Sequence, residues 1–322
     1  MIRITTSLSI RLAEVGACLL LACLFGCADA DPKRVIGISI MTSENPFFVE
    51  LAHAAQDEAA KYDFNVELVS GDKKAENQAR QVQDFIAKKV HAILLTPCDA
   101  KLVSAPIKAA NKAGIPVFTA DTGCLDPSAK VVSHVATDNY SGGKQAGYAM
   151  IEALGGKGGK ILVLSFDVAQ SCLARVKGFR EVIDAHNAAQ ADARIEIVAE
   201  LPGEASREPS SRATADTLEK NGDLVGVFAI NDPSALGAVA AIEAAGKQSQ
   251  IKVIGFDGQK IGKQAIKEGK IYADPIQFPK KMGRMIVRQM VKYFDGETPP
   301  RLIPIPTSLY RRADAEQDPD LK

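Results

Sequence analysis

Short β-branched apolar runs alternate with longer helical patterns along most of the chain, and this alternation limits the possible folds most strongly. The runs lie at residues 35–40, 66–69, 92–95, 116–119, 131–135, 161–164, 195–198, 225–228 and 253–256. Near-continuous apolar strands separated by helices are typical of parallel sheets covered on both faces. Roughly nine such strands, with a seam near Thr137, predict an α/β fold made of two doubly wound parallel sheets.

Composition agrees with two globular domains and argues against several classes of protein. At about 100 to 200 residues per domain, the 322 residues suggest two domains behind a leader. The 39 basic and 39 acidic residues cancel, and no polybasic stretch stands out, so a nucleic-acid partner is not expected. With 4 histidines in the chain, a His-rich metal site or His-based catalysis is also not expected. No cofactor is predicted.

The first 27 residues have the features of an export signal. Arg3 and Arg11 precede an apolar run over residues 15–25, which is shorter than the roughly 20 residues that a membrane-spanning helix needs. Leu-Phe-Gly-Cys at residues 24–27 resembles a bacterial lipobox and predicts a periplasmic protein tethered by lipid at Cys27. Two other processing sites remain open, a small-x-small sequence at 28–30 and a second lipobox-like sequence at 20–23. No later stretch is apolar enough to span a membrane.

Three cysteines follow the leader, which allows at most one intramolecular disulfide. They are Cys98, Cys124 and Cys172. A disulfide can persist in an oxidising compartment, and Cys98 and Cys124 follow two strands of the same predicted lobe. A Cys98–Cys124 bridge is therefore one possibility, and three buried free thiols are the other.

Polar and aromatic side chains follow the predicted strands, where ligands bind in open parallel sheets. They are Asn45, Phe47, Phe48, Asp121, Asn231, Asp257 and Gln277. Carboxylates and amides bind hydroxyl groups, and aromatic rings pack on the C–H face of a sugar. Each residue also has an ordinary structural explanation, such as a helix N-cap or a core ring. Their common position favours a cleft for a polyhydroxylated ligand.

Longer sequences carry a resemblance to a known family. They are Asn-Pro-Phe-Phe at 45–48, Ser-His-Val-Ala-Thr-Asp-Asn at 133–139, Asn-Asp at 231–232 with Ala-Leu-Gly-Ala at 235–238, and Gly-Phe-Asp-Gly at 255–258. In these the chain resembles the type I periplasmic sugar-binding proteins, most closely the ribose type, from about residue 35 to the C-terminal segment. The resemblance implies a monomer with two α/β lobes joined by a three-segment hinge, which closes on a ligand and is presented to an ABC permease.

The resemblance also implies boundaries and roles. The expected parts are a signal peptide with lipobox at 1–27, a first lobe at 34–137 plus 278–296, a second lobe at 138–277 plus 297–312, and a frayed polar tail at 313–322. Asn45 and Asp121 would bond sugar hydroxyls, and Phe47 and Phe48 would sandwich the sugar ring. Asn231, Asp257 and Gln277 would close the site from the second lobe and the hinge.

Three positions depart from the ribose-type pattern. Thr122 and Leu173 stand where sugar-binding arginines are expected, and Ala205 aligns with a third aromatic ring. Carboxylates without arginine partners repel each other and are costly to bury, so another group must compensate. Arg175 or Arg207 could do so, or the ligand could be bulkier and better hydrated, or carry positive charge, as an amino sugar does. The departures make ribose doubtful and favour another sugar or polyol.

The predicted function is therefore that of an extracytoplasmic solute-binding protein for sugar import. The alternative is a sugar sensor that presents its closed form to a chemoreceptor or receptor kinase. A transcription regulator would need a DNA-binding domain where the leader stands. An enzyme is not expected, because Asp121 and Asp257 fit a binding site better than an acid–base pair.

Overall fold

The computed structural model describes residues 33–322, of which Val35–Lys322 form one unit that holds both predicted sheets. The predicted signal peptide and Cys27 lie outside the described residues. Within residues 33–322, no helix is long and apolar enough to cross a membrane.

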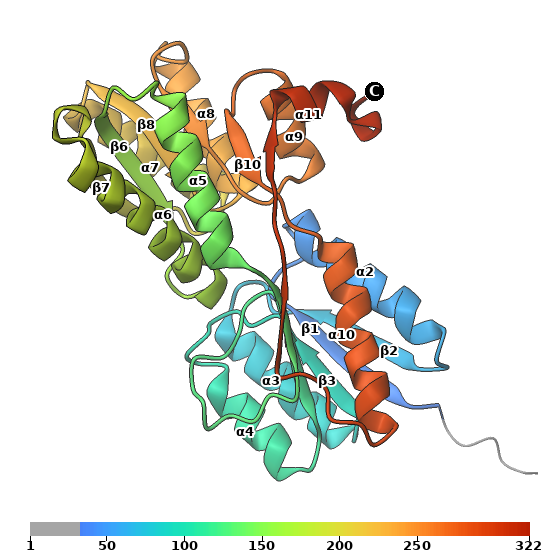
Figure 1. Cartoon of the computed structure of the whole chain (residues 1–322). Coiled ribbons are helices and arrows are strands. Elements are labelled where there is room, and N and C mark those ends of the chain that lie inside the picture. Colours follow the sequence, from blue (N-terminus) through green and yellow to red (C-terminus); the bar gives the residue numbers. More distant parts are fainter. Residues whose placement is uncertain (1–32) are drawn as a thin grey trace, which may run out of the picture. The chain divides into compact units, whose positions relative to one another are not determined.

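The first sheet has six strands in the order β11-β5-β4-β3-β1-β2, all parallel. The strands are β1 (Val35–Ile40), β2 (Asn65–Ser70), β3 (Ala92–Leu95), β4 (Val117–Ala120), β5 (His134–Thr137) and β11 (Leu302–Ile305). The helices are α2 (Pro46–Ala60), α3 (Ala75–Ala87), α4 (Ser104–Lys112) and α10 (Pro279–Phe294). Helices α2 and α10 pack together, and α3 packs with α4 on the other side of the sheet (Figure 1). We call this sheet and its helices the first lobe.

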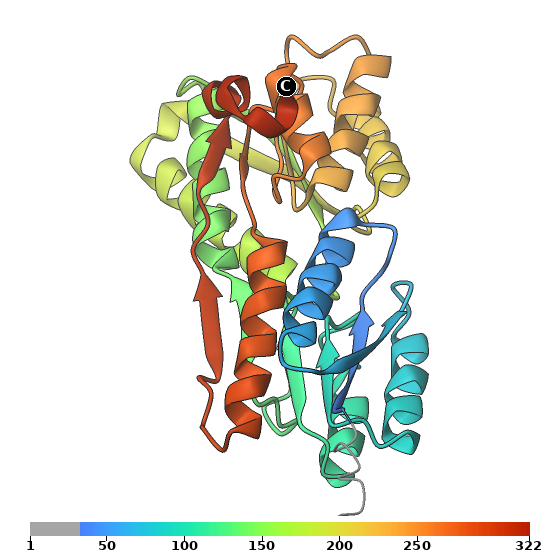
Figure 2. The ribbon, with the colours of Figure 1, turned by 90° about the vertical axis from the view of Figure 1, so that its right-hand side faces the viewer.

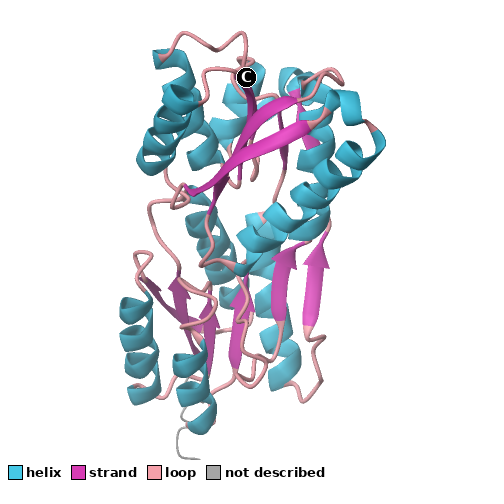
Figure 3. Cartoon of the chain, turned by 90° about the vertical axis from the view of Figure 1, so that its left-hand side faces the viewer, coloured by secondary structure: helices cyan, strands magenta, loops and turns pink. Residues whose placement is uncertain are grey.

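The second sheet also has six strands, in the order β12-β10-β9-β8-β6-β7. The strands are β6 (Gly159–Ser165), β7 (Ile195–Pro202), β8 (Leu224–Ala229), β9 (Lys252–Ile254), β10 (Ala273–Pro275) and the antiparallel β12 (Leu309–Arg311). The helices are α5 (Asn139–Ala153), α6 (Gln170–Ala189), α7 (Arg207–Lys220), α8 (Asp232–Ala244), α9 (Lys260–Lys267) and α11 (Arg312–Gln317), with short 3₁₀ turns η2 (Ala191–Ala193) and η3 (Pro319–Leu321). This sheet with its helices is the second lobe. Figure 3 shows the strands of each lobe side by side with helices around them.

The chain passes between the lobes three times, from β5 to α5, from β10 to α10 and from β11 to β12. Figure 2 shows the last of these as an extended segment. The predicted fold of two doubly wound parallel-sheet lobes is therefore confirmed. The strands that we predicted from β-branched runs are β1 to β9, and β10, β11 and β12 carry no such run. A strand buried on both faces must be apolar throughout, as the fully buried β3 is.

The assignment of residues 297–312 to the second lobe is wrong for the first half of that segment. Leu302–Ile305 pairs in register with His134–Thr137 of β5, so β11 is an edge strand of the first sheet. The β12 strand alone joins the second sheet. An edge strand is half exposed, and Leu302 is 59% exposed, so the sequence carries a weak strand signal there.

The predicted frayed tail is also wrong, because α11 and η3 are packed against the second lobe. Ala315 and Leu321 are buried in its core, and Asp318 accepts hydrogen bonds from Lys263 Nζ at 2.9 Å and Tyr310 Oη at 2.8 Å. Two apolar side chains among many polar ones are enough to anchor a short helix when both face the same neighbour, here α9.

Candidate functional site

A cavity lies between the two lobes, at the ends of the parallel strands where polar side chains were predicted. It encloses about 420 Å³ of atom-free space, its open mouth included. Its walls contain all but one of the predicted ligand-site residues, namely Asn45, Phe47, Phe48, Asp121, Thr122, Arg175, Ala205, Asn231, Asp257 and Gln277. The structure therefore brings together residues that are as far apart in sequence as Asn45 and Gln277.

The first turn of α2 forms one wall. Asn45 caps this helix, with its Oδ1 accepting from Phe47 N at 3.0 Å, and Pro46 occupies the first helical position. Phe47 and Phe48 are both buried, and their rings meet edge to face with centroids 5.1 Å apart and planes at 87°. Two rings in contact with each other cannot hold a sugar ring between them. The implied sandwich is therefore wrong, and the rings form two perpendicular walls.

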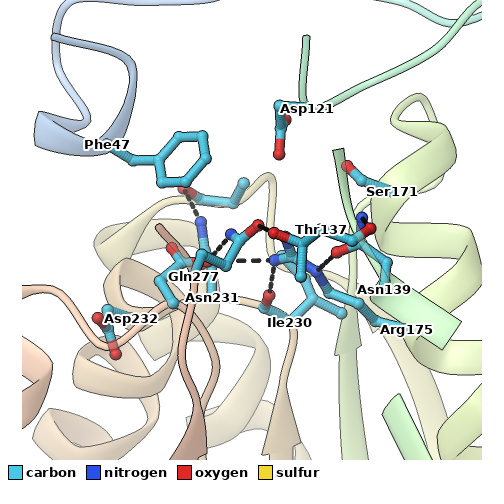
Figure 4. Close-up of polar contacts among 12 residues, drawn as sticks. Phe47, Asp121, Thr137, Asn139, Ser171, Arg175, Ile230, Asn231, Asp232 and Gln277 are labelled. Atoms are coloured by element: carbon cyan, nitrogen blue, oxygen red, sulfur yellow. Dashed lines mark hydrogen bonds and ion pairs between the residues drawn. The ribbon is translucent and has the colours of Figure 1, made fainter. Parts of the chain in front are cut away.

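Asp121 follows β4 and faces the cavity from the first lobe (Figure 4). Its φ of 62° is uncommon for a residue with a side chain, and such strain is typical of functional positions. Thr122 Oγ1 donates to Asp121 Oδ2 at 3.2 Å, while the buried Asp121 Oδ1 has no hydrogen-bond partner. Burial raises the pKa of Asp121 to about 6, although Arg175 opposes the rise. An unsatisfied buried acceptor is costly, so Asp121 Oδ1 is a candidate position for a ligand's hydrogen-bond donor.

Asp257 follows β9 and faces Asp121 from the second lobe, with a φ of 108°. It accepts from Gln277 Nε2 at 2.7 Å, from Gln259 Nε2 at 3.1 Å and from Arg175 Nη1 at 3.2 Å. Burial raises the pKa of Asp257, and Arg175 and the two glutamines oppose the rise. Gln277 Oε1 accepts in turn from Thr137 Oγ1 at 2.7 Å, which ties Asp257 to the crossover segments (Figure 4).

Arg175, one of the two arginines that we expected could compensate for the missing cations, lines the cavity. The guanidinium lies 3.9 Å from the ring centroid of Phe256, with Nε donating to Asn139 Oδ1 at 2.8 Å and Nη1 to Ile230 O at 2.6 Å. It is 3% exposed. These contacts hold the cation in the cavity wall and leave its Nη2 for a ligand.

The prediction that Leu173 occupies a ligand-site position is wrong. Leu173 is 38% exposed and does not line the cavity. Two steps along an α-helix turn the side chain by about 200°, so Leu173 and Arg175 lie on nearly opposite faces of α6. Arg207, the other proposed source of compensation, is exposed at the start of α7 and is also outside the cavity wall.

Lys73 also lines the cavity, although it was not among the predicted site residues. Its Nζ reaches across from the first lobe to donate to Ser206 Oγ and, at 3.4 Å, to Glu204 O of the second lobe. Lys73 follows β2, so the rule applied to the other strands would have found it. With Lys73 and Arg175 opposite Asp121 and Asp257, the formal charges of the cavity cancel.

Two further contacts link the lobes around the cavity. Thr122 Oγ1 lies 2.9 Å from Ser171 Oγ, so the position expected to hold an arginine carries a hydroxyl that bonds the opposite lobe. Gln259 Nε2 donates to Asn45 Oδ1 at 2.8 Å as well as to Asp257. Neither Ser171 nor Gln259 was predicted, because a lone serine or glutamine gives no sequence signal.

Two buried carboxyls lie behind Asp257. Asp232 and Asp274 are fully buried. Gln259 N donates to Asp232 Oδ2 at 2.7 Å. The other three carboxylate oxygens of the two residues have no hydrogen-bond donor among the described residues. Burial, with Asp274 beside it, raises the pKa of Asp232 well above its usual range, and burial raises the pKa of Asp274 to about 6. Through its bond from Gln259 N, Asp232 anchors the segment that carries Gln259.

The possible disulfide is not formed, and Cys98, Cys124 and Cys172 are free thiols. Cys98 Sγ lies 3.6 Å from Met41 O, whereas Cys124 Sγ lies 3.8 Å from Asp126 O. The two thiols therefore contact different loops. Cys172 lines the cavity, and burial raises its pKa to about 12, which keeps the thiol protonated.

Comparison with known proteins gives concordant matches. A family model described as a periplasmic binding protein domain matches residues 36–298. The ribose import binding protein of Escherichia coli (strain K12) is 34% identical over 272 residues, which cover 84% of this chain and 88% of that protein.

Two solved structures are similar over almost the same region. An ABC transporter solute binding protein from Bacillus halodurans C-125 with bound myo-inositol has a TM-score of 0.80 and 26% identity, covering 88% of this chain and 96% of that one. A periplasmic solute binding protein from Actinobacillus succinogenes 130z with bound D-allose has a TM-score of 0.79 and 27% identity, covering 89% of this chain and 100% of that one.

Proposed function

Since this chain belongs to the periplasmic binding protein family, we propose that it captures a sugar or polyol between its lobes and delivers it to an ABC permease. The relatives described above are named as an import binding protein and as transporter solute binding proteins, which supports transport. The proposal assigns the ligand to the cavity and uses hinge closure around it as the mechanism of capture.

The observation that carries the proposal is the unpartnered carboxylate of Asp121. Its buried Oδ1 lacks a donor, while Arg175 Nη2 lacks an acceptor among the contacts described above. Neighbouring hydroxyls of a polyol satisfy both groups, because a hydroxyl donates one hydrogen bond and accepts others. Phe47 and Phe48 offer apolar faces to the C–H groups of the same ligand.

The charges of the cavity favour a neutral sugar or polyol as the ligand. Lys73 and Arg175 balance Asp121 and Asp257, so the argument for an amino sugar loses its basis. Thr122 and Ala205 remain the reasons to expect a ligand other than ribose.

A thermal-shift panel of pentoses, hexoses, amino sugars and polyols tests the proposal, read with an external dye because the chain has 0 tryptophans. A ligand at 100 times its Kd stabilises the fold by about 2.7 kcal/mol. For a protein of this size the shift in Tm is roughly 2 °C or more. Asp121→Asn is expected to weaken binding about 10- to 100-fold, whereas the exposed Asp192→Asn should not. The proposal fails if no sugar shifts the Tm and mass spectrometry finds no small molecule carried through purification.

Lipidation of Cys27 and residence at the periplasmic face of the membrane belong to the same proposal. The sequence at residues 24–27 supports it. Metabolic labelling with a fatty-acid analogue should mark the protein and not its Cys27→Ser variant. A labelled Cys27→Ser variant would move the anchor to Cys23, and an unlabelled wild-type protein would leave the cleavage site at 28–30.

A further inference from the structure

A second, larger groove lies beside the ligand cavity and is formed by both lobes. Its first-lobe wall is formed by Phe47 and Glu50 of α2 and the first turns of α10. The other wall is formed by η3 and by Gly258, Gln259, Lys260 and Lys263. The groove holds about 1,540 Å³ of atom-free space, its open side included. Figure 2 shows α2 and α10 side by side below the C-terminal helical segment.

The groove carries cations that no acidic side chain balances. Lys260 of α9 and Lys281 and Arg284 of α10 are exposed, and within residues 33–322 none of the three forms an ion pair. Lys281 and Arg284 are three residues apart, so they lie on one face of α10, while Lys260 stands on the opposite lobe. Positive charge therefore lines both sides.

The other charged groups of the groove do not cancel this excess. Lys263 bonds Asp318 at 2.9 Å, and Lys280 lies 3.8 Å from Glu50. Asp320 is the remaining acidic side chain of the wall apart from Asp257, which Arg175 holds, and the side chain of Lys322 adds a further cation. An occupant must therefore bring negative charge.

The groove also exposes apolar surface between its cations. Phe278 is 37% exposed, and it lines the groove together with Pro279 and Pro319. Aromatic and apolar contacts at the centre with charges at the rim are the usual arrangement of a protein interface. A planar bilayer surface cannot enter a groove between two helical walls, whereas an extended or helical segment can.

From these features we infer that the groove docks an acidic, amphipathic segment of a partner protein. Lys260, Lys281 and Arg284 bind its carboxylates, and Phe278 binds its apolar face. Helix-in-groove recognition of this kind places apolar anchors one turn apart, with charges beside them.

The groove shares residues with the ligand cavity, which couples the two. Phe47, Asp257 and Gln277 line both, and Gln259 of the groove wall bonds Asn45 of the first lobe and Asp257 of the second. Because its walls belong to different lobes, lobe closure sets its width. By linkage, a ligand that favours closure raises the affinity for the docked segment. This coupling, but not the docking itself, rests on the proposed function.

Fluorescence anisotropy with a defined peptide tests the docking without any sugar. The probe is a fluorescein-labelled 16-residue helical peptide with glutamates on one face and leucines on the other, beside a counterpart with glutamine for glutamate. At low salt, the mature protein should bind the glutamate peptide at least tenfold more tightly than its counterpart. Lys281→Glu/Arg284→Glu should lose at least fivefold in affinity. Lys112→Glu/Lys130→Glu, which reverses two exposed lysines outside the groove, should stay within twofold of wild type.

Two results would overturn the docking site. One is equal binding of the glutamate peptide by wild type and by the Lys281→Glu/Arg284→Glu variant. The other is a wild-type protein that does not bind the peptide but sediments with phosphatidylglycerol vesicles, when the Lys281→Glu/Arg284→Glu variant does not sediment. That result would assign the cations to a membrane surface.

A sugar found in the thermal panel should raise peptide affinity at least twofold, and an unchanged affinity would refute the coupling. If the panel finds no ligand, the peptide measurements still decide the docking site.

Discussion

Replacing Arg175 with methionine keeps much of the side chain's length but removes the charge that faces Asp257. Arg175 and Asp257 are each 3% exposed in their side chains, and Arg175 also bonds Asn139 and Ile230 O. Removing one partner of a buried ion pair leaves the other charge uncompensated, at a cost of about 3–5 kcal/mol. We therefore expect Arg175→Met to lower the free energy of unfolding by that amount at pH 8, and to abolish ligand binding.

The loss should depend on pH in a definite direction. Burial already raises the pKa of Asp257, and losing Arg175 raises it further. When the folded-state pKa of a carboxyl is raised, the folded protein favours the protonated form. The carboxyl therefore destabilises the fold little at low pH, and this destabilisation grows as the pH rises toward and through the folded pKa. The difference between Arg175→Met and wild type should thus be smaller at pH 5 than at pH 8.

Urea unfolding at both pH values measures the effect. Leu173→Ala is the matched control on the same helix, and should cost less than about 1 kcal/mol because the side chain is partly exposed. Adding Asp257→Asn to Arg175→Met should recover part of the lost stability. A loss below 1 kcal/mol at pH 8, or an equal loss at both pH values, would refute the assigned ion pair.

Three further substitutions test other parts of the structure. Because the pKa of Asp274 rises from 3.8 to about 6, wild-type stability should fall as the pH rises from 4 through 6. Asp274→Asn should then be the more stable protein at pH 8 by up to about 3 kcal/mol, and identical pH profiles in urea would contradict this. A Cβ at Gly283 would lie 2.2 Å from Leu51 O where α2 and α10 meet, so Gly283→Ala should cost about 1–3 kcal/mol; an unchanged Tm would show that the helices can separate freely. Leu321→Ala should cost about 2 kcal/mol or more if η3 is anchored in the core, and no change in the urea midpoint would restore the frayed tail.

The alternation of apolar runs and helical patterns determined the fold class, because strands covered on both faces must be apolar throughout. The strand-end rule found Asp121, Asn231, Asp257 and Gln277, since the ends of parallel strands meet at one edge of a sheet whatever the rest of the chain does. The predicted resemblance to type I periplasmic sugar-binding proteins is confirmed by the match over residues 36–298.

The tertiary structure decided what local sequence could not express. The ribose-type pattern made Leu173 look like a site residue, but Arg175, two positions further along α6, lines the cavity instead. Ser171 and Gln259 make contacts across the lobes with residues 49 and 214 positions away, which no local pattern encodes. Lys73 stands after a strand, but its bond to Ser206 of the second lobe depends on how the lobes pack. Edge strand β11 and the packed tail have weak apolar signals because half of each faces water. The sequence thus determines which side chains stand at strand ends, while lobe packing decides which of them share one cavity.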